Sequence, residues 1–303
     1  MSGPVVVLAG GSGGAKLARG MLDVAGADLT VIANTADDIE IYGAHVSPDP
    51  DLVTFWLADC IDDRGWGLRD DTFAVMDGLR ELGVEVWFSL GDRDLAIGIE
   101  RARRLADGAR LTDALAELGA ALGVQARVLP MSDEPVRTWV RCHAHWTPFQ
   151  EFMVRDGAAG PVQSTQLRGI GEARPTPEIL AAIAGASAIV IGPSNPVISI
   201  GPILQVPEMR QALLDSPAPI VAVSPIVGGA VLKGPTEEFM RWAGHDASAA
   251  GIADCYAGLI DGLVADEPVE GLPVLRTDTL MTDAASRRRL ATETLAFAQG
   301  LAA

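Results

Sequence analysis

The stretch Val5-Val6-Val7-Leu8-Ala9-Gly10-Gly11-Ser12-Gly13-Gly14-Ala15-Lys16-Leu17 indicates how the chain begins to fold. Its β-branched first part is typical of a buried strand. Glycines and a serine interrupt that pattern, and from Ala15 the apolar residues recur at helical spacing, so we expect a helix to begin there. A strand, a glycine turn and a helix aim backbone N–H groups and the positive end of the helix dipole at one point. The stretch therefore predicts an anion site at the end of the first strand.

The spacing of this loop narrows the kind of anion site. It is not a Walker loop, because Lys16 is not followed by Ser or Thr, and it is not a full dinucleotide fingerprint, because Lys16 stands where the third glycine belongs. A tight strand-to-helix turn that binds nothing is the alternative. The predicted nucleotide-binding residues of the loop are Gly10, Gly11, Ser12, Gly13, Gly14 and Lys16.

Composition excludes several classes of partner. The 303 residues include 40 acidic and 23 basic side chains, and the formal net charge is −17. Such a charge argues against nucleic acid or an anionic membrane as the main partner. Three widely spaced cysteines form neither a metal motif nor a disulfide framework. No signal peptide or membrane-length apolar run is evident, so we expect a reduced, cytoplasmic protein.

Three aspartates follow early elements of the predicted fold. A second strand at Leu29–Ala33 leads to Asp38, and Asp49 and Asp51 precede a helix predicted from Leu52. In an open parallel sheet, loops at the carboxyl ends of the strands gather around the ligand crevice. Carboxylates facing a phosphate loop need a cation between them, and Mg²⁺ held by one or two carboxylates plus substrate phosphates has that character. Ordinary capping and turn chemistry is the alternative.

Later loops add candidate ligand contacts. Trp66, in a glycine-rich loop, and Arg93, after a strand predicted near residues 84–89, could contact a planar or anionic ligand. A structural tryptophan and a local Arg–Asp ion pair are the alternatives. Neutral loops follow two further predicted strands and suit a nucleotide in an acidic protein. Their candidate residues are Gly192, Ser194, Asn195, Ser199 and Ser224.

Alternating strand and helix patterns predict an α/β fold. We expect a Rossmann-like, mostly parallel sheet with helices on both faces, in a single domain over residues 1–303. The stretch 125–175 alternates with the period of half-exposed strands and is expected to be a β-rich insertion or subdomain.

Nine motifs in order give the chain a family resemblance over nearly its whole length. It resembles the 2-phospho-L-lactate transferase family of coenzyme F420 biosynthesis, which includes bacterial phosphoenolpyruvate transferases. The motifs are residues 8–17, Asn34-Thr35-Ala36-Asp37-Asp38, Ser47-Pro48-Asp49-Pro50-Asp51, Arg64-Gly65-Trp66-Gly67, Leu90-Gly91-Asp92-Arg93-Asp94, Leu129-Pro130-Met131-Ser132-Asp133, Gly192-Pro193-Ser194-Asn195-Pro196, Ser224-Pro225-Ile226 and Leu280-Met281-Thr282.

The resemblance implies a reaction. A guanosine diphosphate carries a phospholactyl or enolpyruvyl group, and the ribityl hydroxyl of the deazaflavin Fo attacks the phosphate that bears it, releasing GMP in a Mg²⁺-dependent step. It also implies that Asp51 and Arg93 contact the deazaflavin, that Asp38 and Asp49 hold the metal, and that the protein is a homodimer. Asp51 and Asp49 are the expected catalytic residues, and Asp51→Ala is expected to abolish turnover in a folded protein.

Two other readings compete with the transferase. A sister family of gluconeogenesis factors, which resembles the chain at the first loop, would make it a non-catalytic regulator that binds nucleotide sugars. An NAD-dependent dehydrogenase is disfavoured by the missing third glycine and by Asn34 at the position of a ribose-binding acid. The chain departs from its relatives at Pro50 and at Leu52-Val53-Thr54. The transferred group, whether phospholactate, phosphoenolpyruvate or phosphoglycerate, is not fixed by any side chain.

Overall fold

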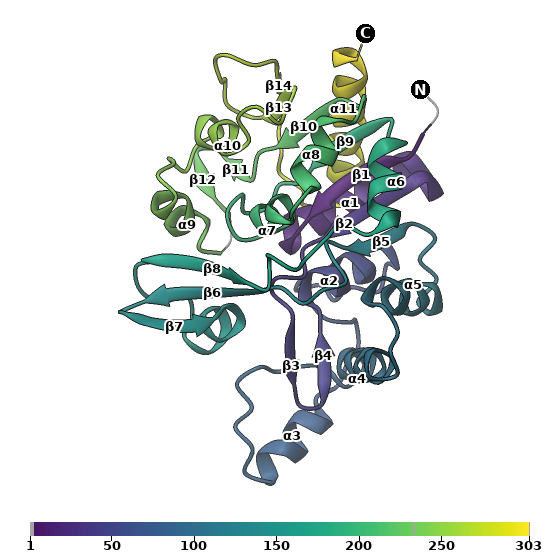
Figure 1. The fold of residues 1–303 in the computed structure, drawn as a ribbon, viewed down its shortest axis with the longest axis vertical. Helices are drawn as coiled ribbons and strands as arrows, with labels where there is room; N and C mark the ends of the chain where they lie inside the picture. Colours follow the sequence, from purple (N-terminus) through teal and green to yellow (C-terminus); the bar gives the residue numbers. More distant parts are fainter. Residues whose placement is uncertain (1–2, 233, 303) are drawn as a thin grey trace.

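A seven-stranded parallel sheet forms the centre of the protein, in a computed structural model that describes residues 3–232 and 234–302 (Figure 1). The strand order is β14-β13-β10-β9-β1-β2-β5, and every ladder between neighbours is parallel. The predicted α/β class with a mostly parallel sheet is therefore confirmed. The strands span Val5–Ala9 (β1), Leu29–Ala33 (β2), Arg127–Pro130 (β5), Ala188–Ile191 (β9), Ile220–Val223 (β10), Gly262–Ala265 (β13) and Val274–Arg276 (β14).

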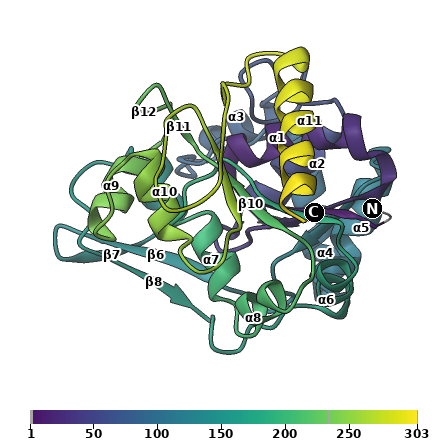
Figure 2. The same cartoon turned by 90° about the horizontal axis from the view of Figure 1, so that it is seen from above.

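Helices cover both faces of this sheet, as Figure 2 shows. Alternate strand residues point to opposite faces, so β1 contributes Val6 and Leu8 to one apolar core and Val5 and Val7 to the other. The first face packs against α6 (Pro177–Ala184), α7 (Ile200–Gln205), α8 (Met209–Leu214) and α10 (Ala249–Cys255). The second packs against α1 (Gly11–Ala25), α2 (Pro48–Leu57) and α11 (Ala284–Leu301). Burial on both faces explains the unbroken apolar strands.

The strand order reverses between β1 and β9. From β1 the chain builds outward through β2 and β5, and then returns to the other side of β1 to build β9, β10, β13 and β14. Such a switch point opens a crevice at the carboxyl ends of the two central strands. The loops after β1 and β9 therefore meet there, although residues 10 and 192 are far apart in sequence.

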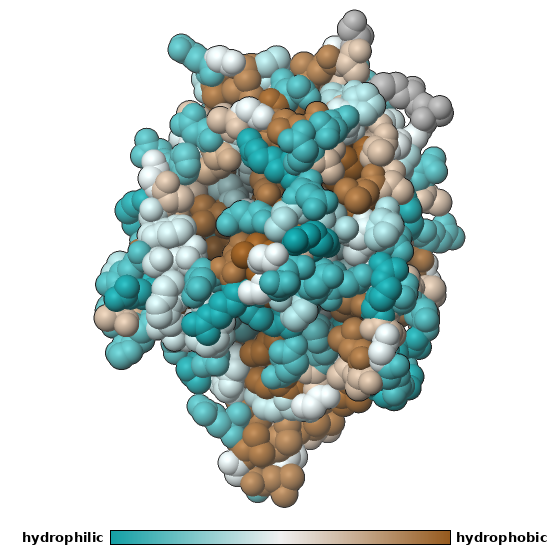
Figure 3. Space-filling model, viewed as in Figure 1, coloured by the Kyte–Doolittle hydropathy of each residue, from teal (hydrophilic) through white to brown (hydrophobic). Residues whose placement is uncertain are grey.

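Smaller units surround the carboxyl edge of the sheet (Figure 1). A hairpin of β3 (Ile39–Ile41) and β4 (Ala44–Val46) packs with α3 (Ala74–Glu81) and α4 (Asp92–Ala106) around a separate small core. The remaining helix of this half is α5 (Leu111–Ala121). Figure 3 shows apolar side chains over the tip that α3 forms, where Leu82 is 81% exposed.

The segment 125–175 contains two kinds of strand. β5 belongs to the central sheet, whereas β6 (Arg137–Cys142), β7 (His145–Pro148) and β8 (Ser164–Arg168) form an antiparallel three-stranded sheet. A π-helical turn, Glu151–Arg155, follows β7. The C-terminal half also contains a short hairpin of β11 (Ile226–Val227) and β12 (Ala230–Val231), and helix α9 (Thr236–Trp242). Within the described residues, no helix has the length and apolarity that crossing a membrane requires.

Several boundaries differ from the prediction. Helix α1 begins at Gly11 rather than Ala15, so the glycines form its first turn. Helix α2 begins at Pro48, which places Asp49 and Asp51 in its first turn rather than on a loop. Residues 84–89 form no strand, and Arg93 lies in the first turn of α4 rather than in a loop after a strand. In each case polar or glycine residues that usually mark loops form the start of a helix instead.

Candidate functional site

The glycines after β1 allow the two central loops to touch. A Cβ on Gly13 would collide with the carbonyl oxygen of Pro193, and one on Gly14 would lie 2.8 Å from Ser194 Oγ. The hydroxyl of Ser194 donates to the carbonyl oxygen of Gly10. The sequence thus uses glycine where the N-terminus of α1 meets the β9 loop. The structure therefore brings the first glycine loop and the Gly192–Pro196 loop together, as predicted for a crevice at the switch point.

Asp49 joins this loop to α2. Its Oδ1 accepts the backbone N–H of Gly11 at 2.6 Å, and its Oδ2 accepts Asn34 Nδ2 at 2.9 Å. Burial, and to a smaller extent the charge of Asp38, raises the pKa of Asp49 to about 6. The hydrogen bonds from Gly11 and Asn34 act in the opposite direction. Asp49 is therefore an acid at the N-terminus of α1, where an anionic ligand would be expected.

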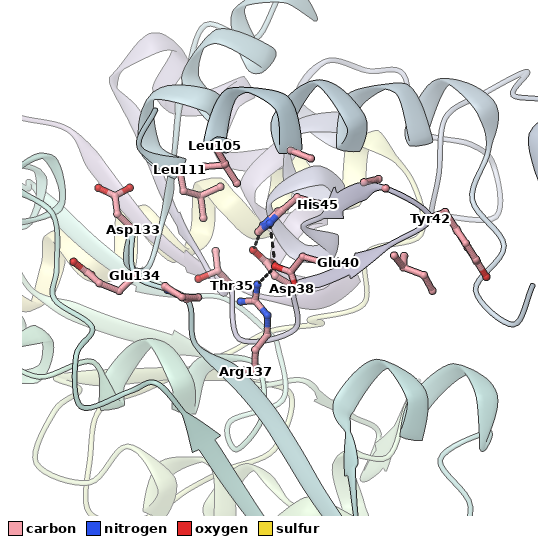
Figure 4. Close-up of a pocket in the computed structure, with 15 residues that line it drawn as sticks. Thr35, Asp38, Glu40, Tyr42, His45, Leu105, Leu111, Asp133, Glu134 and Arg137 are labelled. Carbon is pink, nitrogen blue, oxygen red and sulfur yellow. Dashed lines mark hydrogen bonds and ion pairs between the residues drawn. The ribbon is translucent and has the colours of Figure 1, made fainter. Parts of the chain in front are cut away.

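Asp38 faces a different space, which we call the hairpin pocket (Figure 4). This 610 Å³ cavity lies beside the β3–β4 hairpin and is also lined by residues of α4 and α5 and by Arg137. Asp38 accepts Ser47 Oγ at 2.8 Å and lies 3.0 Å from His45 Nε2. Burial lowers the pKa of His45, but its hydrogen bonds to Asp38 and Glu40 raise it overall to about 8. Asp38 is thus held by a protonated imidazole and a hydroxyl.

Asp51 is held by a buried cation. The guanidinium of Arg101, which is 0% exposed, donates to both carboxylate oxygens of Asp51, at 3.0 Å from Nη1. Nη1 also donates to the carbonyl oxygen of His45 at 2.9 Å, and the N–H of Ser47 reaches Asp51 at 3.3 Å. This bidentate geometry fixes the orientation of the Asp51 carboxylate.

Ser47 links the separate aspartates into one cluster. Its hydroxyl contacts Asp38 and its N–H contacts Asp51, while Asp49 lies between these positions in sequence. A fourth member, Asp37, has a pKa raised well above its usual range by burial and by the charges of Asp49 and Asp38. Four buried carboxyl groups with few cations make a cluster that a divalent cation would stabilise.

The donor set fits a cation only in part. Among the described residues, no three His, Cys, Asp or Glu side chains converge as a complete metal site. Mg²⁺ needs fewer protein ligands, because one or two carboxylates together with substrate phosphates suffice. Asp49 lies at the glycine loop and Asp38 faces the hairpin pocket, and each oxygen of both carboxylates accepts one hydrogen bond, which leaves a second lone pair on each for an ion.

A second cavity of 420 Å³ lies beside the first turn of α2, and we call it the α2 pocket. Its size is within the range that holds a small organic ligand. Its polar wall includes Arg64, Gln150 and four carboxylates, namely Asp49, Asp51, Asp71 and Asp94. Its apolar wall includes Phe55, Trp66, Leu68, Phe73, Phe88 and Leu90. Trp66 is 57% exposed, so its ring can cover a planar ligand.

Lys16 and Ser199 lie beside the glycine loop in different ways. Lys16 Nζ donates to the carbonyl oxygen of Met281 at 3.4 Å and lies 5.9 Å above the ring of Trp56, so it links α1 to the segment before α11. Ser199 faces Gly10, where an added Cβ would lie 2.7 Å from Ser199 Cβ. Ser12 follows in the first turn of α1.

Other predicted contacts lie in internal turns. Asn195 Oδ1 accepts the N–H groups of Val197 and Ile198 at 2.9 and 3.2 Å, which stabilises its own loop. Ser224 is fully buried, and its Oγ accepts the N–H of Ile226 at 3.1 Å. These contacts are ordinary turn chemistry, and nucleotide binding by the two residues stays a prediction.

Arg93 lies at the start of α4 and is exposed. Its Nη1 donates to the carbonyl oxygen of Arg69 at 3.1 Å, and its N–H to Asp71 at 2.9 Å. Arg93 does not line the α2 pocket, whereas Arg64 does. The structure thus places Asp51 and Trp66 in the wall of this pocket and Arg93 outside it.

The sequence reasoning missed Asp94 and Arg101 as site residues. Helix α4 was not predicted, because its first residues read as a loop. The signal was present in their spacing, since residues seven apart lie on one face of a helix. Gly98 lies between them on that face, where an added Cβ would lie 3.0 Å from Ala44 Cβ.

Relatives with similar sequences are named as transferases. The family described as 2-phospho-L-lactate transferase CofD matches residues 5–286. A 2-phospho-L-lactate transferase of Methanosarcina mazei is 38% identical over 298 residues, which cover 95% of this chain and 98% of the relative. A phosphoenolpyruvate transferase of Kitasatospora aureofaciens is 39% identical over 97% of this chain and 98% of the relative.

Similarity to solved structures concerns the fold. A crystal structure of a UPF0052 family member from Bacillus halodurans superimposes with a TM-score of 0.62 at 17% identity, covering 96% of this chain and 99% of that protein. This likeness shows the fold alone. The match over residues 5–286 and the similar sequences of full-length relatives decide the family: the chain is an enzyme of the transferase class and belongs to the 2-phospho-L-lactate transferase CofD family.

Proposed function

We propose that the enzyme transfers a phospholactyl or phosphoenolpyruvyl group from a guanylylated donor to the terminal ribityl hydroxyl of the deazaflavin Fo. In the donor, the group is joined through its own phosphate to GMP. The hydroxyl oxygen forms a bond to that phosphorus, the bridging P–O bond breaks, and GMP leaves. The product is a phosphodiester between the ribityl chain and the transferred acid. The names of the relatives support this reaction.

One observation carries the proposal. Asp49 lines the α2 pocket and also accepts the N–H of Gly11, so the pocket adjoins the glycine loop. A donor with its diphosphate at this loop would therefore present its phosphorus to a ligand in the α2 pocket. Transfer of a phosphoryl group needs this kind of positioning and neutralisation of charge more than it needs covalent chemistry.

The donor side is proposed to use the two central loops. The N-terminus of α1 and Lys16 favour anionic phosphates, and the proposed contacts Gly10 to Gly14, Gly192, Ser194 and Ser199 surround that helix end. Asn195 and Ser224 are proposed to support the nucleotide from their turns. Bound Mg²⁺ would neutralise charge on the phosphate oxygens, with Asp49 and Asp38 as its proposed ligands.

The acceptor side is proposed to be the α2 pocket. A deazaflavin ring suits the apolar wall, where Trp66 is proposed to stack on it. Asp51, fixed by Arg101, is proposed to accept a hydrogen bond from the ribityl hydroxyl and to orient it for attack. Arg93, outside the pocket wall, is proposed to reach the polar edge of the ring.

The decisive experiment is product analysis by mass spectrometry. The purified protein is incubated with Fo, Mg²⁺ and, in separate reactions, the guanylylated forms of phospholactate, phosphoenolpyruvate and phosphoglycerate. A phosphodiester of Fo with one of these acids, formed together with GMP and lost on chelation of the metal, is the expected result. Formation of no such product with any donor would refute the proposal.

We also propose that the protein is a homodimer in the cytoplasm. The exposed apolar tip at α3, where Leu82 is 81% exposed, offers a surface for a homodimer. The three cysteines are free, which suits the reducing cytoplasm. Light scattering of the wild-type protein and of Leu82→Glu would test the dimer.

A further inference from the structure

The four carboxylates of the α2 pocket differ in how they are bound. Both oxygens of Asp51 accept from Arg101, and both oxygens of Asp49 accept from Gly11 and Asn34. Asp71 accepts the N–H groups of residues 72, 93 and 94. Among the described residues, none donates a hydrogen bond to the carboxylate of Asp94. Within the described part of the chain, Asp94 is therefore the carboxylate of this wall whose oxygens are not already held by a donor, so it is the one best able to take up a proton.

Helix α4 fixes the position of Asp94. Asp94, Gly98 and Arg101 lie on one face of the helix, because they are four and three residues apart. Gly98 lets this face approach the β4 strand, since an added Cβ would lie 3.2 Å from the carbonyl oxygen of His45. The same close approach seats Arg101 against Asp51. This face of α4 thus holds the Asp51 carboxylate of α2 through Arg101 and presents the unclamped carboxylate of Asp94 to the same pocket.

The surroundings of Asp94 make it a base that works near neutral pH. Burial, then the charge of Asp51 on α2, and also that of Asp71 before α3, raise the pKa of Asp94 to about 7, although Arg101 opposes them. Asp49 and Arg64 are the other charged groups of the pocket wall. A general base is most effective when its pKa lies near the working pH, because it is then both ionised and able to hold a proton.

We propose that Asp94 accepts the proton of the hydroxyl that attacks the phosphorus in the α2 pocket, while Asp51, clamped by Arg101, orients that hydroxyl. This assignment rests on the proposed transferase reaction. The O–H bond of the ribityl hydroxyl breaks and its proton passes to a carboxylate oxygen of Asp94. The freed oxygen pair forms the new P–O bond, and the bridging P–O pair leaves with GMP. No oxidant or reductant is involved.

The test compares Asp94→Asn with the wild-type enzyme in steady-state kinetics with Fo. Loss of general base catalysis is expected to lower kcat by about 10²- to 10⁴-fold. The KM for Fo is expected to change by less than about threefold, because Asn keeps the size and the polar contacts of Asp. Asp77→Asn is the matched control, since Asp77 pairs with Arg80 on the surface of α3. It is expected to leave both constants unchanged.

A pH profile separates catalysis from a structural role. In the wild type, kcat/KM is expected to decrease as the pH falls below about 7. This decrease is expected to be absent in Asp94→Asn and to remain in Asp94→Glu. A wild-type rate that is flat from pH 6 to pH 8 would overturn the assignment even if a variant fails to fold. An Asp94→Asn enzyme with normal kcat, or with only a raised KM, would overturn it as well.

The outcomes also distinguish the two proposals. A wild-type protein that makes no phosphodiester from Fo with any of the three donors overturns the transferase reaction and the role of Asp94 together. A wild type that makes the product while Asp94→Asn keeps its kcat overturns the role of Asp94 alone.

Discussion

The ion pair between Arg101 and Asp51 gives the most direct test of how this site is built. Arg101→Met removes the guanidinium and leaves the Asp51 carboxylate and the His45 carbonyl without these donors. The pair is almost fully buried, with the two side chains 0% and 9% exposed. Deleting one member of a buried pair costs about 3–5 kcal/mol, because the other charge stays buried and uncompensated. We expect Arg101→Met to lose this amount.

The size of the effect on thermal stability follows from chain length. An unfolding entropy of roughly 2.1 cal/mol/K per residue gives about 0.6 kcal/mol per degree for a chain of this length, so a loss of ~4 kcal/mol lowers Tm by about 6 °C. Urea unfolding followed by circular dichroism measures the free energy directly. Arg101→Lys keeps the charge but not the bidentate fork, and is expected to lose about 1–2 kcal/mol.

A double-mutant cycle tests whether the charges of Arg101 and Asp51 compensate each other. Asp51→Leu alone strands the buried guanidinium and is expected to cost as much as Arg101→Met. The double variant removes both charges, so it is expected to recover most of the stability. A double variant that loses the sum of the two single costs, or an Arg101→Met that loses less than about 1 kcal/mol, would refute this account of the pair. The same reasoning applies to Asp51→Ala. We expect that variant to destabilise the fold as well as to stop turnover, so its loss of activity must be compared with its stability.

Three further variants test the glycine loop, the pocket wall and the charge of Asp94. Gly13→Ala is expected to cost about 3 kcal/mol or more in urea unfolding, because its Cβ meets the backbone of the β9 loop. Gly11→Ala, with a φ of +62° and only Ser199 Oγ near its Cβ, at 4.0 Å, should cost about 1–2 kcal/mol, and equal costs would contradict the packing. Trp66→Ala should weaken Fo binding about 10-fold in a fluorescence titration, with unchanged Tm, while the exposed Trp146→Ala on β7 should bind normally. The pKa of Asp94 is raised to about 7 from 3.8, so the folded protein holds a proton that the unfolded chain releases at lower pH, and its ionisation costs stability as the pH rises from about 4 to 7. At about 1.4 kcal/mol per pKa unit, Asp94→Asn should therefore be more stable than the wild type by up to about 4 kcal/mol at pH 8 and equal to it at pH 4, and the same difference at both pH values would contradict the shift.

The central sheet could be predicted from sequence because its strands are buried on both faces. Such strands are short apolar runs between glycine and polar loops, and the bounds predicted for β2, Leu29–Ala33, agree with the structure. Each run needs only local information. The two loops at the switch point were predicted for the same reason, since each directly follows such a strand.

The helix starts around the site could not be predicted in this way. In α2 the first turn contains two prolines and two aspartates, residues that also mark turns, and its N-terminal residue Ser47 makes no side-chain cap. The first turn of α4 reads Asp-Arg-Asp, which resembles a surface loop. Only the tertiary partners show that these segments are helical: Gly11 for Asp49, Arg101 for Asp51, and the N–H groups of residues 74 and 75 for Asp92.

The roles of the aspartates were hardest to predict, because residue type alone does not separate them. Asp38, Asp49, Asp51 and Asp94 are all buried or half-buried near one crevice, yet each has a different environment: an imidazole and a hydroxyl, a helix N-terminus, a guanidinium, and like charges. The environment decides whether a carboxylate orients a hydroxyl, faces a cation or takes a proton. Each of these partners lies at least seven residues away in sequence. The sequence motifs of the family therefore contain these acids, and the contacts that each acid makes in the folded chain determine its chemical role.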